Sequence, residues 1–231
     1  MKTIGLIGGM SWESTALYYK LINQGVATQL GGLHSAKILL YSVDFAEIEA
    51  LQREGNWEVA GQLLAQAAQK LATGGADFIV LCTNTMHKVA SWIETASNLP
   101  LLHIADATAE RLLADGIHRV GLLATRYTME QDFYRGRLAD RYGLEVLVPA
   151  QPDRDIIHRV IYDELCHGII QPKSKAEYCR IIQTLIDQGA QGIIFGCTEI
   201  GMLVTASDVA TSVYDTTQIH AEQAVYLALK E

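Results

Sequence analysis

Short apolar runs alternate along the chain with longer segments of helical periodicity. The apolar runs are rich in Ile, Leu and Val and cover residues 3–7, 37–41, 78–81, 119–123, 145–148 and 192–195. Between them, apolar residues recur at helical spacing in residues 14–29, 58–72, 131–142, 156–166, 175–188 and 216–229. Runs that are apolar on both faces and separated by helices indicate parallel strands covered on both sides. The pattern therefore predicts an α/β protein of the doubly wound kind.

The chain also contains an internal repeat. Residues 71–85 are echoed by residues 185–199 at a constant offset of 114 residues, as from Thr83 to Cys197. Residues 119–124 similarly resemble residues 4–9, the first apolar run. We therefore predict two similar α/β domains, residues 1–115 and 116–231, with a boundary near Gly116. No Ser/Gly/Pro linker separates them, so we expect them to pack around a cleft, and the last helix either stays with the second domain or packs back on the first.

Composition narrows the range of functions. The formal net charge of -8 and the absence of a Lys/Arg cluster argue against a nucleic-acid partner. No apolar segment approaches the ~20 residues that span a bilayer, and the first ten residues are too short a run for a signal peptide. The four cysteines form no CxxC pair and no zinc spacing, which argues against a metal site and favours free thiols. We expect a cytoplasmic protein without a metal.

Candidate chemistry gathers at the ends of the predicted strands. In doubly wound folds, ligands bind beyond the carboxyl ends of the strands. Residues 8–11, 82–85, 124–126 and 196–199 are rich in glycine, hydroxyl or thiol groups there. Backbone N–H groups at the start of each following helix suit a carboxylate or phosphate. Thr83 and Cys197 take equivalent positions in the repeat, and two such groups facing one ligand could handle a proton from opposite sides.

The glycine pattern does not indicate a nucleotide site. Gly5, Gly8 and Gly9 do not fit G-x-G-x-x-G, and the chain lacks G-x-x-x-x-G-K-[ST]. They favour a tight turn between a strand and a helix. No lysine follows a strand in the position that a pyridoxal phosphate Schiff base would need. We therefore expect the protein to work without a cofactor.

The four thiols differ in their predicted roles. Cys197 follows a strand and opens a helix, where the dipole and free N–H groups would lower its pKa from about 8.5 toward neutrality. The alternative is a small buried hydrophobic residue. Cys82 precedes the position equivalent to Cys197 by one residue, so it would point to the opposite face and pack in the core. Cys166 and Cys179 lie on predicted helices and are expected to be inert.

For other side chains near the strand ends, the sequence allows two roles each. His87 follows Thr83 by one helical turn and either tunes the site or is a solvated or capping histidine. Glu199 either orients Cys197 or favours the helix dipole as an N-terminal carboxylate. Gln52 and Arg53, expected in a loop before a glycine, could reach the cleft, although Arg53 could equally be a surface charge.

The segments 84–87 and 197–199, Asn-Thr-Met-His and Cys-Thr-Glu, resemble the aspartate/glutamate racemase family. Residues 7–14 and 161–165 support the resemblance, which extends over nearly the whole sequence. It implies two α/β domains related by pseudo-twofold symmetry, an active site in the cleft between them, no cofactor, and a cysteine from each domain beside the substrate. Cys-Thr-Glu is the form of the second motif found in aspartate-type members.

The first motif departs from the family. Where the family usually has Cys-Asn-Thr, this chain has Thr-Asn-Thr at residues 83–85, which is similar to the subgroup of L-aspartate/glutamate-specific racemases. The resemblance implies a racemase independent of pyridoxal phosphate (PLP) that acts on an acidic amino acid and is a possible homodimer. Cys197 would be the base on the L-face and Thr83 the opposite group. The implied substrate-binding residues are Met10, Gln52, Asn84, Thr85, Thr198 and Glu199.

Two other functions stay open. The chain could be a binding protein that clamps a small dicarboxylate, its chemistry lost with the first cysteine. It could also be a related isomerase, of the maleate isomerase or hydantoin racemase type, that acts on another small carbonyl compound. The residues do not decide between aspartate and glutamate.

Overall fold

A computed structural model describes residues 1–230, which fall into two compact units. Among these residues, the first unit comprises 1–104 and 220–230, and the second comprises 105–219. Helix α5 (Ile104–Ala114) thus belongs almost entirely to the second unit, whereas a division near Gly116 would have assigned it to the first. From His220 onward, helix α11 (Thr216–Leu229) belongs to the first unit.

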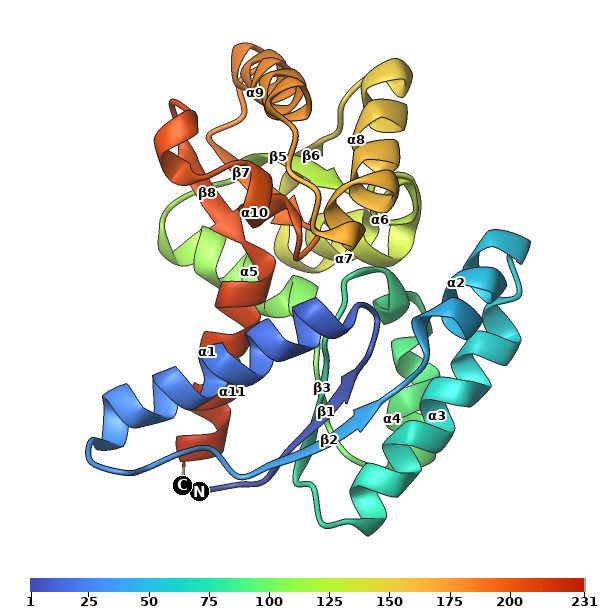
Figure 1. Ribbon diagram of the computed structural model, residues 1–231. Coiled ribbons are helices and arrows are strands. Elements are labelled where there is room, and N and C mark those ends of the chain that lie inside the picture. The colour runs from blue at the N-terminus through green and yellow to red at the C-terminus, as the bar shows by residue number, and fades with distance from the viewer. Residues whose placement is uncertain (231) are drawn as a thin grey trace. The chain divides into compact units, whose positions relative to one another are not determined.

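The first unit is built around a four-stranded parallel sheet in the order β2-β1-β3-β4 (Figure 1). Its strands are β1 (Ile4–Gly8), β2 (Ile38–Ser42), β3 (Phe78–Leu81) and β4 (Leu101–Leu102). Its helices are α1 (Trp12–Leu30), α2 (Phe45–Glu54), α3 (Trp57–Thr73), the 3₁₀ helix η1 (Thr85–Val89) and α4 (Ala90–Ser97), together with most of α11.

Helices cover both faces of this sheet. On one face Leu6 and Val80 pack with α1 and α11, and on the other Ile7 and Leu81 pack with α2, α3 and α4. Figure 1 shows the same two layers of helices on either side of β1 and β3. Both central strands are buried along their whole length, which explains why their sequences are continuous apolar runs.

The second unit repeats this plan with a sheet in the order β6-β5-β7-β8. Its parallel strands are β5 (Arg119–Ala124), β6 (Glu145–Leu147), β7 (Gly192–Gly196) and β8 (Ser212–Asp215). Its other elements are α6 (Arg126–Glu130), α7 (Asp132–Tyr142), α8 (Gln151–Asp163), η2 (Leu165–His167), α9 (Pro172–Asp187), α10 (Ile200–Leu203) and η3 (Ala206–Asp208). The equivalent strand orders confirm the predicted pair of similar α/β folds.

A close turn after β1 explains one of the N-terminal glycines. Gly9 has φ +93, and a Cβ added there would lie 2.1 Å from the carbonyl oxygen of Val43. The Gly9 backbone N–H donates to Thr15 Oγ1 at 2.8 Å, which ties the turn to the start of α1. Only glycine fits so close a backbone approach at positive φ. The glycine pair therefore serves a tight turn, as the sequence predicted.

Candidate active site

Thr83 lies just beyond β3, in a segment whose backbone is fixed on several sides. The ladder between β1 and β3 ends at the pair of Ile7 with Leu81, and the Cys82 N–H then donates to the Ile7 carbonyl at 2.9 Å. The hydroxyl of Ser14 donates to the Cys82 carbonyl at 3.3 Å. Thr83 is half-buried. The fold therefore holds a hydroxyl side chain at a rigid strand end of the first unit.

Cys82 and His87 flank this position in different ways. Cys82 packs in the apolar cluster beneath α1 and α11, and burial raises the pKa of its thiol. Its prediction as a core residue is confirmed. His87 is fully enclosed, so the reading as a solvated histidine is wrong, and its Nδ1 lies 2.8 Å from the Thr83 carbonyl oxygen. His87 therefore contacts the backbone of the candidate catalytic residue directly.

The structure brings Gln52 to the same segment. Gln52 and Arg53 lie in helix α2 and not in the loop expected from the sequence. The Gln52 side chain is 3 % exposed, and its Nε2 donates to the sulfur of Met86 at 3.0 Å. Arg53 points to the surface and pairs with Glu49 at 3.8 Å. Helix α2 therefore places the buried amide of Gln52 against Met86, whereas the adjacent Arg53 is a surface charge.

Three further residues predicted for the first half of the site are buried. Asn84 and Thr85 precede and open the 3₁₀ helix η1, and both side chains are almost inaccessible. Met10 follows the glycine turn, and its side chain joins the apolar cluster under α3. We conclude that Met10 shapes the surroundings mainly as a packing residue. Its contact with a substrate stays a prediction.

The second unit places Cys197 at the end of β7, beside a buried carboxylate. The Cys197 thiol donates to Glu199 Oε2 at 3.0 Å, and the Thr198 hydroxyl donates to the same oxygen at 2.6 Å. Cys197 is half-buried, Thr198 is buried and Glu199 is 5 % exposed. A thiol held against a buried carboxylate is arranged for proton exchange between sulfur and oxygen.

This carboxylate reverses the expected acidity of the thiol. Burial raises the pKa of Cys197 well above its ordinary value, and the Glu199 charge and its hydrogen bond with the thiol raise it further. The sequence-based prediction of a lowered pKa is wrong. The helix that follows, α10, has only four residues, so its dipole is small beside a full negative charge in direct contact. A raised pKa favours the protonated form of Cys197.

Other groups around Cys197 were not anticipated. The charge of a Cys166 thiolate would add to the increase in the pKa of Cys197, which places Cys166 within electrostatic reach of this thiol. That Cys166 is inert stays a prediction. Tyr178 is buried nearby; burial and then the charges of Cys197, Glu164 and Cys166 raise its pKa. Its hydroxyl donates to the Ile157 carbonyl at 3.0 Å. These residues come from η2, α8 and α9, and spacing alone could not bring them to β7.

The neighbouring strand of the second sheet ends at the same edge. Ala124 of β5 pairs with Gly196 of β7, so Thr125 and Cys197 each follow a paired residue. Thr125 is buried and caps α6, its hydroxyl accepting the Thr128 N–H at 3.4 Å. The carboxyl edge of this sheet therefore gathers hydroxyl, thiol and carboxylate groups, as the strand-end argument predicted.

Within residues 1–230, no group of three or more His, Cys, Asp or Glu residues is arranged to hold a metal ion. None of the helices in this part of the chain is long and apolar enough to cross a membrane.

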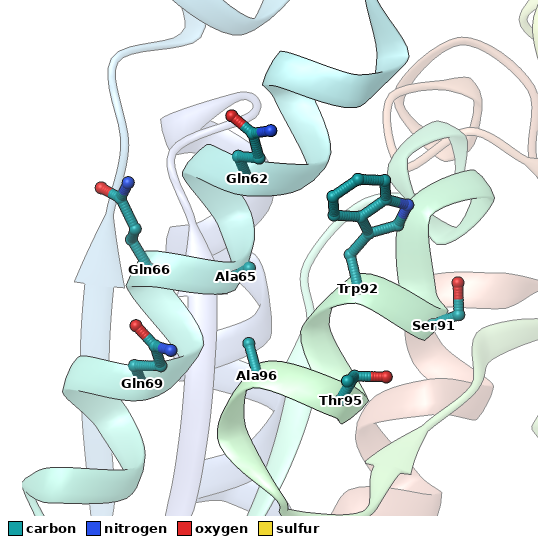
Figure 2. A pocket seen from close by; sticks show the side chains of 8 residues that line it. All are labelled: Gln62, Ala65, Gln66, Gln69, Ser91, Trp92, Thr95 and Ala96. Atoms are coloured by element: carbon teal, nitrogen blue, oxygen red, sulfur yellow. The ribbon is translucent and has the colours of Figure 1, made fainter.

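A surface hollow of about 490 Å³ lies between α3 and α4 of the first unit (Figure 2). Gln62 of α3 and Trp92 of α4 are among the residues that line it, and none of the predicted site residues does.

Comparisons with known proteins point to one family. The family model for Asp/Glu/hydantoin racemases matches residues 7–224. A crystal structure of a candidate Asp/Glu racemase from Yersinia pestis is 61% identical, with both chains fully covered and a TM-score of 0.94. An aspartate racemase homologue from Pyrococcus horikoshii OT3 is 35% identical, with 99% of each chain covered and a TM-score of 0.84.

A more distant relative is a glutamate racemase from Pseudomonas aeruginosa, 28% identical over 162 residues. The match covers 69% of this chain and 58% of that relative's length. The family model spans nearly the whole chain and both units carry the same sheet plan. The protein therefore belongs to the Asp/Glu/hydantoin racemase family, a family of isomerases.

Proposed function

We propose that this protein is a cofactor-independent racemase of L-aspartate and L-glutamate. Cys197 removes the α-proton on the L-face, and Thr83 delivers a proton to the opposite face. The observation that carries the proposal is the equivalence of the two residues. Each follows the third strand of a parallel sheet with the same strand order, one in each unit. Family membership and the aspartate racemase homologue at 35% identity support this choice of reaction and substrate.

Inversion of an α-carbon requires two acid/base groups that straddle it. In this proposal the substrate contacts both Thr83 and Cys197. Backbone N–H groups of segments 84–85 and 198–199 bind its carboxylates, with Met10 and Gln52 at the border of the pocket. Because η1 and α10 are short, individual N–H groups rather than helix dipoles hold these anions. Oriented donors there would stabilise the enolate-like charge that develops.

The contact between Cys197 and Glu199 explains how a base is made from a thiol of raised pKa. The thiol proton moves along the existing hydrogen bond to Glu199 Oε2, which leaves a thiolate beside a neutral carboxylic acid. The thiolate takes the α-proton, and the carbanion that results receives a proton from the Thr83 hydroxyl. Glu199 returns its proton to solvent and solvent reprotonates the threonine alkoxide, so both groups regain their starting state. Each step therefore transfers one proton and needs no cofactor.

The weak acidity of threonine predicts an imbalance between the two faces. A hydroxyl is much less acidic than a thiol, so proton delivery from Thr83 is slower than proton return from Cys197. The two enantiomers have equal free energy in water, so kcat/KM must be the same in both directions. A preference for the L-form therefore shows itself in exchange: Cys197 swaps the α-hydrogen of the L-substrate with solvent faster than the molecule inverts.

Deuterium exchange tests the proposal. The protein is incubated with L-aspartate or L-glutamate in deuterated water, and recovered L- and D-amino acids are analysed separately for α-deuterium. We expect label in the L-substrate before D-product accumulates, and loss of both signals in Cys197→Ser. Cys179→Ser, which removes a thiol on α9, is the matched control and should behave as the wild type. Unlabelled L-substrate after long incubation rejects the mechanism.

The same experiment separates the alternatives. Thermal stabilisation by aspartate without exchange would indicate a dicarboxylate-binding protein. Exchange with a hydantoin or isomerisation of maleate, but no exchange with amino acids, would indicate the related isomerases. A cytoplasmic location and a homodimer stay predictions from the sequence, and the second can be checked by the molar mass in solution.

A further inference from the structure

A cluster of three buried histidines surrounds the point where the chain leaves the first unit. Residues 1–104 belong to this unit, and the chain returns to it at His220. The ring of His87 lies 4.5 Å from that of His103 and 5.8 Å from that of His220, measured between centroids. All three are buried. Burying a polar ring costs free energy unless its nitrogens are hydrogen-bonded. We therefore asked which donors and acceptors these three imidazoles contact.

Two hydrogen bonds of His87 favour one tautomer of its ring. Nδ1 lies 2.8 Å from the Thr83 carbonyl oxygen, which can only accept a hydrogen bond, so Nδ1 carries the proton. Nε2 lies 3.2 Å from the backbone N–H of Ile104, which can only donate, so Nε2 carries the lone pair. Both ring nitrogens are used when the ring is neutral. Burial, followed by the charges of His103 and His220, keeps the pKa of His87 well below its ordinary value.

The His87 ring lies just beyond the last backbone pairing between β3 and β4. The pairing of β3 with β4 ends at Val80 and Leu102, and β4 has only two residues. Beyond it, a carbonyl at Thr83 and an N–H at Ile104 are joined by one imidazole inserted between them. The imidazole thus bridges the two chain segments after their backbone pairing has ended: Nδ1–H donates to the Thr83 carbonyl, and Nε2 accepts from the Ile104 N–H. The backbone of Thr83 is thereby tied to the residue at which the first unit ends.

We propose that His87 is a positioning residue for Thr83. This inference rests on the function proposed above, in which the Thr83 hydroxyl delivers the proton on the D-face. Ser14 holds the preceding carbonyl of Cys82 in the same way, at 3.3 Å. Two successive carbonyls at the strand end are therefore held by side chains from elsewhere in the unit. A hydroxyl that must meet a carbanion needs such a rigid backbone, because small displacements of a reacting group cost large factors in rate.

Two variants divide the contacts of His87. His87→Asn places an amide donor near the position of Nδ1 and keeps the bond to the Thr83 carbonyl. His87→Gln places an amide oxygen near the position of Nε2 and keeps the bond from Ile104. His220→Gln is the matched control for loss of a buried histidine. The His220 ring contacts Tyr18 OH at 2.8 Å and the Leu102 carbonyl at 2.9 Å, within the same cluster.

The readout is the ratio of α-deuterium exchange in L-substrate to racemisation, with kcat and KM measured for each variant. In His87→Gln we expect kcat for racemisation to fall at least about tenfold, with KM changed less than about threefold, while exchange at Cys197 persists. The ratio therefore rises about tenfold. His87→Asn and His220→Gln should keep the wild-type ratio within about threefold. Equal losses of exchange and racemisation in His87→Asn and His87→Gln would overturn the proposal and leave His87 a structural residue.

A measurement on the wild-type protein keeps this test separate from the proposed function. Nitrogen-15 NMR of the His87 ring should show a protonated Nδ1 and a bare Nε2 from neutral pH down to mildly acidic pH. An Nε2–H tautomer or a doubly protonated ring would overturn the proposal even if both variants fail to fold. If the wild type shows the expected tautomer but exchanges no acidic amino acid, the proposed function fails and the contact with Thr83 stands.

Discussion

Replacement of Glu199 by glutamine should make the Cys197 thiol more acidic. Glu199 Oε2 lies 3.0 Å from the sulfur, and the side chain is 5 % exposed. Two unit charges at that distance repel by ~1.4 kcal/mol even at the dielectric constant of water, and by ~5.5 kcal/mol at an effective value of 20. A helix N-terminus contributes only ~0.3–1 kcal/mol in the opposite direction. The carboxylate therefore dominates, and its removal should raise the thiolate fraction at least about tenfold at pH values below the titration midpoint.

Alkylation by iodoacetamide across a pH series, followed by peptide mass spectrometry, measures this change residue by residue. In Glu199→Gln the midpoint for Cys197 should move to lower pH, and Cys179 in the same samples serves as the internal reference. Midpoints are compared rather than plateau rates, because a more acidic thiolate is also a weaker nucleophile. A midpoint for Cys197 that stays in place or moves to higher pH would refute the assignment of Glu199 as the charge that suppresses ionisation.

Three further predictions concern the opposite face, the turn and the histidines. Thr83→Cys should raise racemisation and allow exchange from the D-enantiomer, because a thiol is the better base; a folded variant slower with both enantiomers would contradict the equivalence of Thr83 to the missing family cysteine. Gly9→Ala should lower the melting temperature more than Gly55→Ala, because its Cβ would lie 2.1 Å from a carbonyl oxygen whereas nothing lies within 4 Å at Gly55. Both glycines have positive φ, so strain common to both, ~1–2 kcal/mol, cancels in this comparison by thermal unfolding. Burial lowers the pKa of His220 to about 4 from 6.5, so the unfolded chain binds a proton that the folded protein does not. The free energy of unfolding should therefore fall as pH drops from about 6.5 toward 4, by up to ~3 kcal/mol from this residue. His220→Gln should show a shallower decline in urea unfolding, and an unchanged pH dependence would count against the neutral buried ring.

The sequence predicts the fold well where burial is complete. The strands β1, β3, β5 and β7 are buried almost throughout, so each appears as an unbroken apolar run whatever its neighbours. Strand β4 has two residues and β8 has only one buried residue in its burial pattern, so neither leaves a periodic signal. Helix α2 was missed for a related reason: its buried residues are Ile48 and Gln52, too few to mark an apolar face.

The candidate site could be proposed from the sequence only as far as the internal repeat reaches. The repeat relates Thr83 to Cys197 because both follow the same strand of equivalent sheets. The acidity of Cys197 was not predictable, because it depends on the direction in which the Glu199 side chain turns. The proximity of Cys166 depends on the path of η2 in the second unit. The exact matching of His87 to a carbonyl and an N–H likewise depends on where β4 ends, which the sequence does not mark.

The most direct test of the account is a crystal structure with L-aspartate or L-glutamate bound. We expect the substrate to bind with Cys197 Sγ on one face of the α-carbon and Thr83 Oγ1 on the other, each within ~3–3.5 Å of the reacting position. A substrate bound elsewhere, or both groups on the same face of the α-carbon, would contradict it.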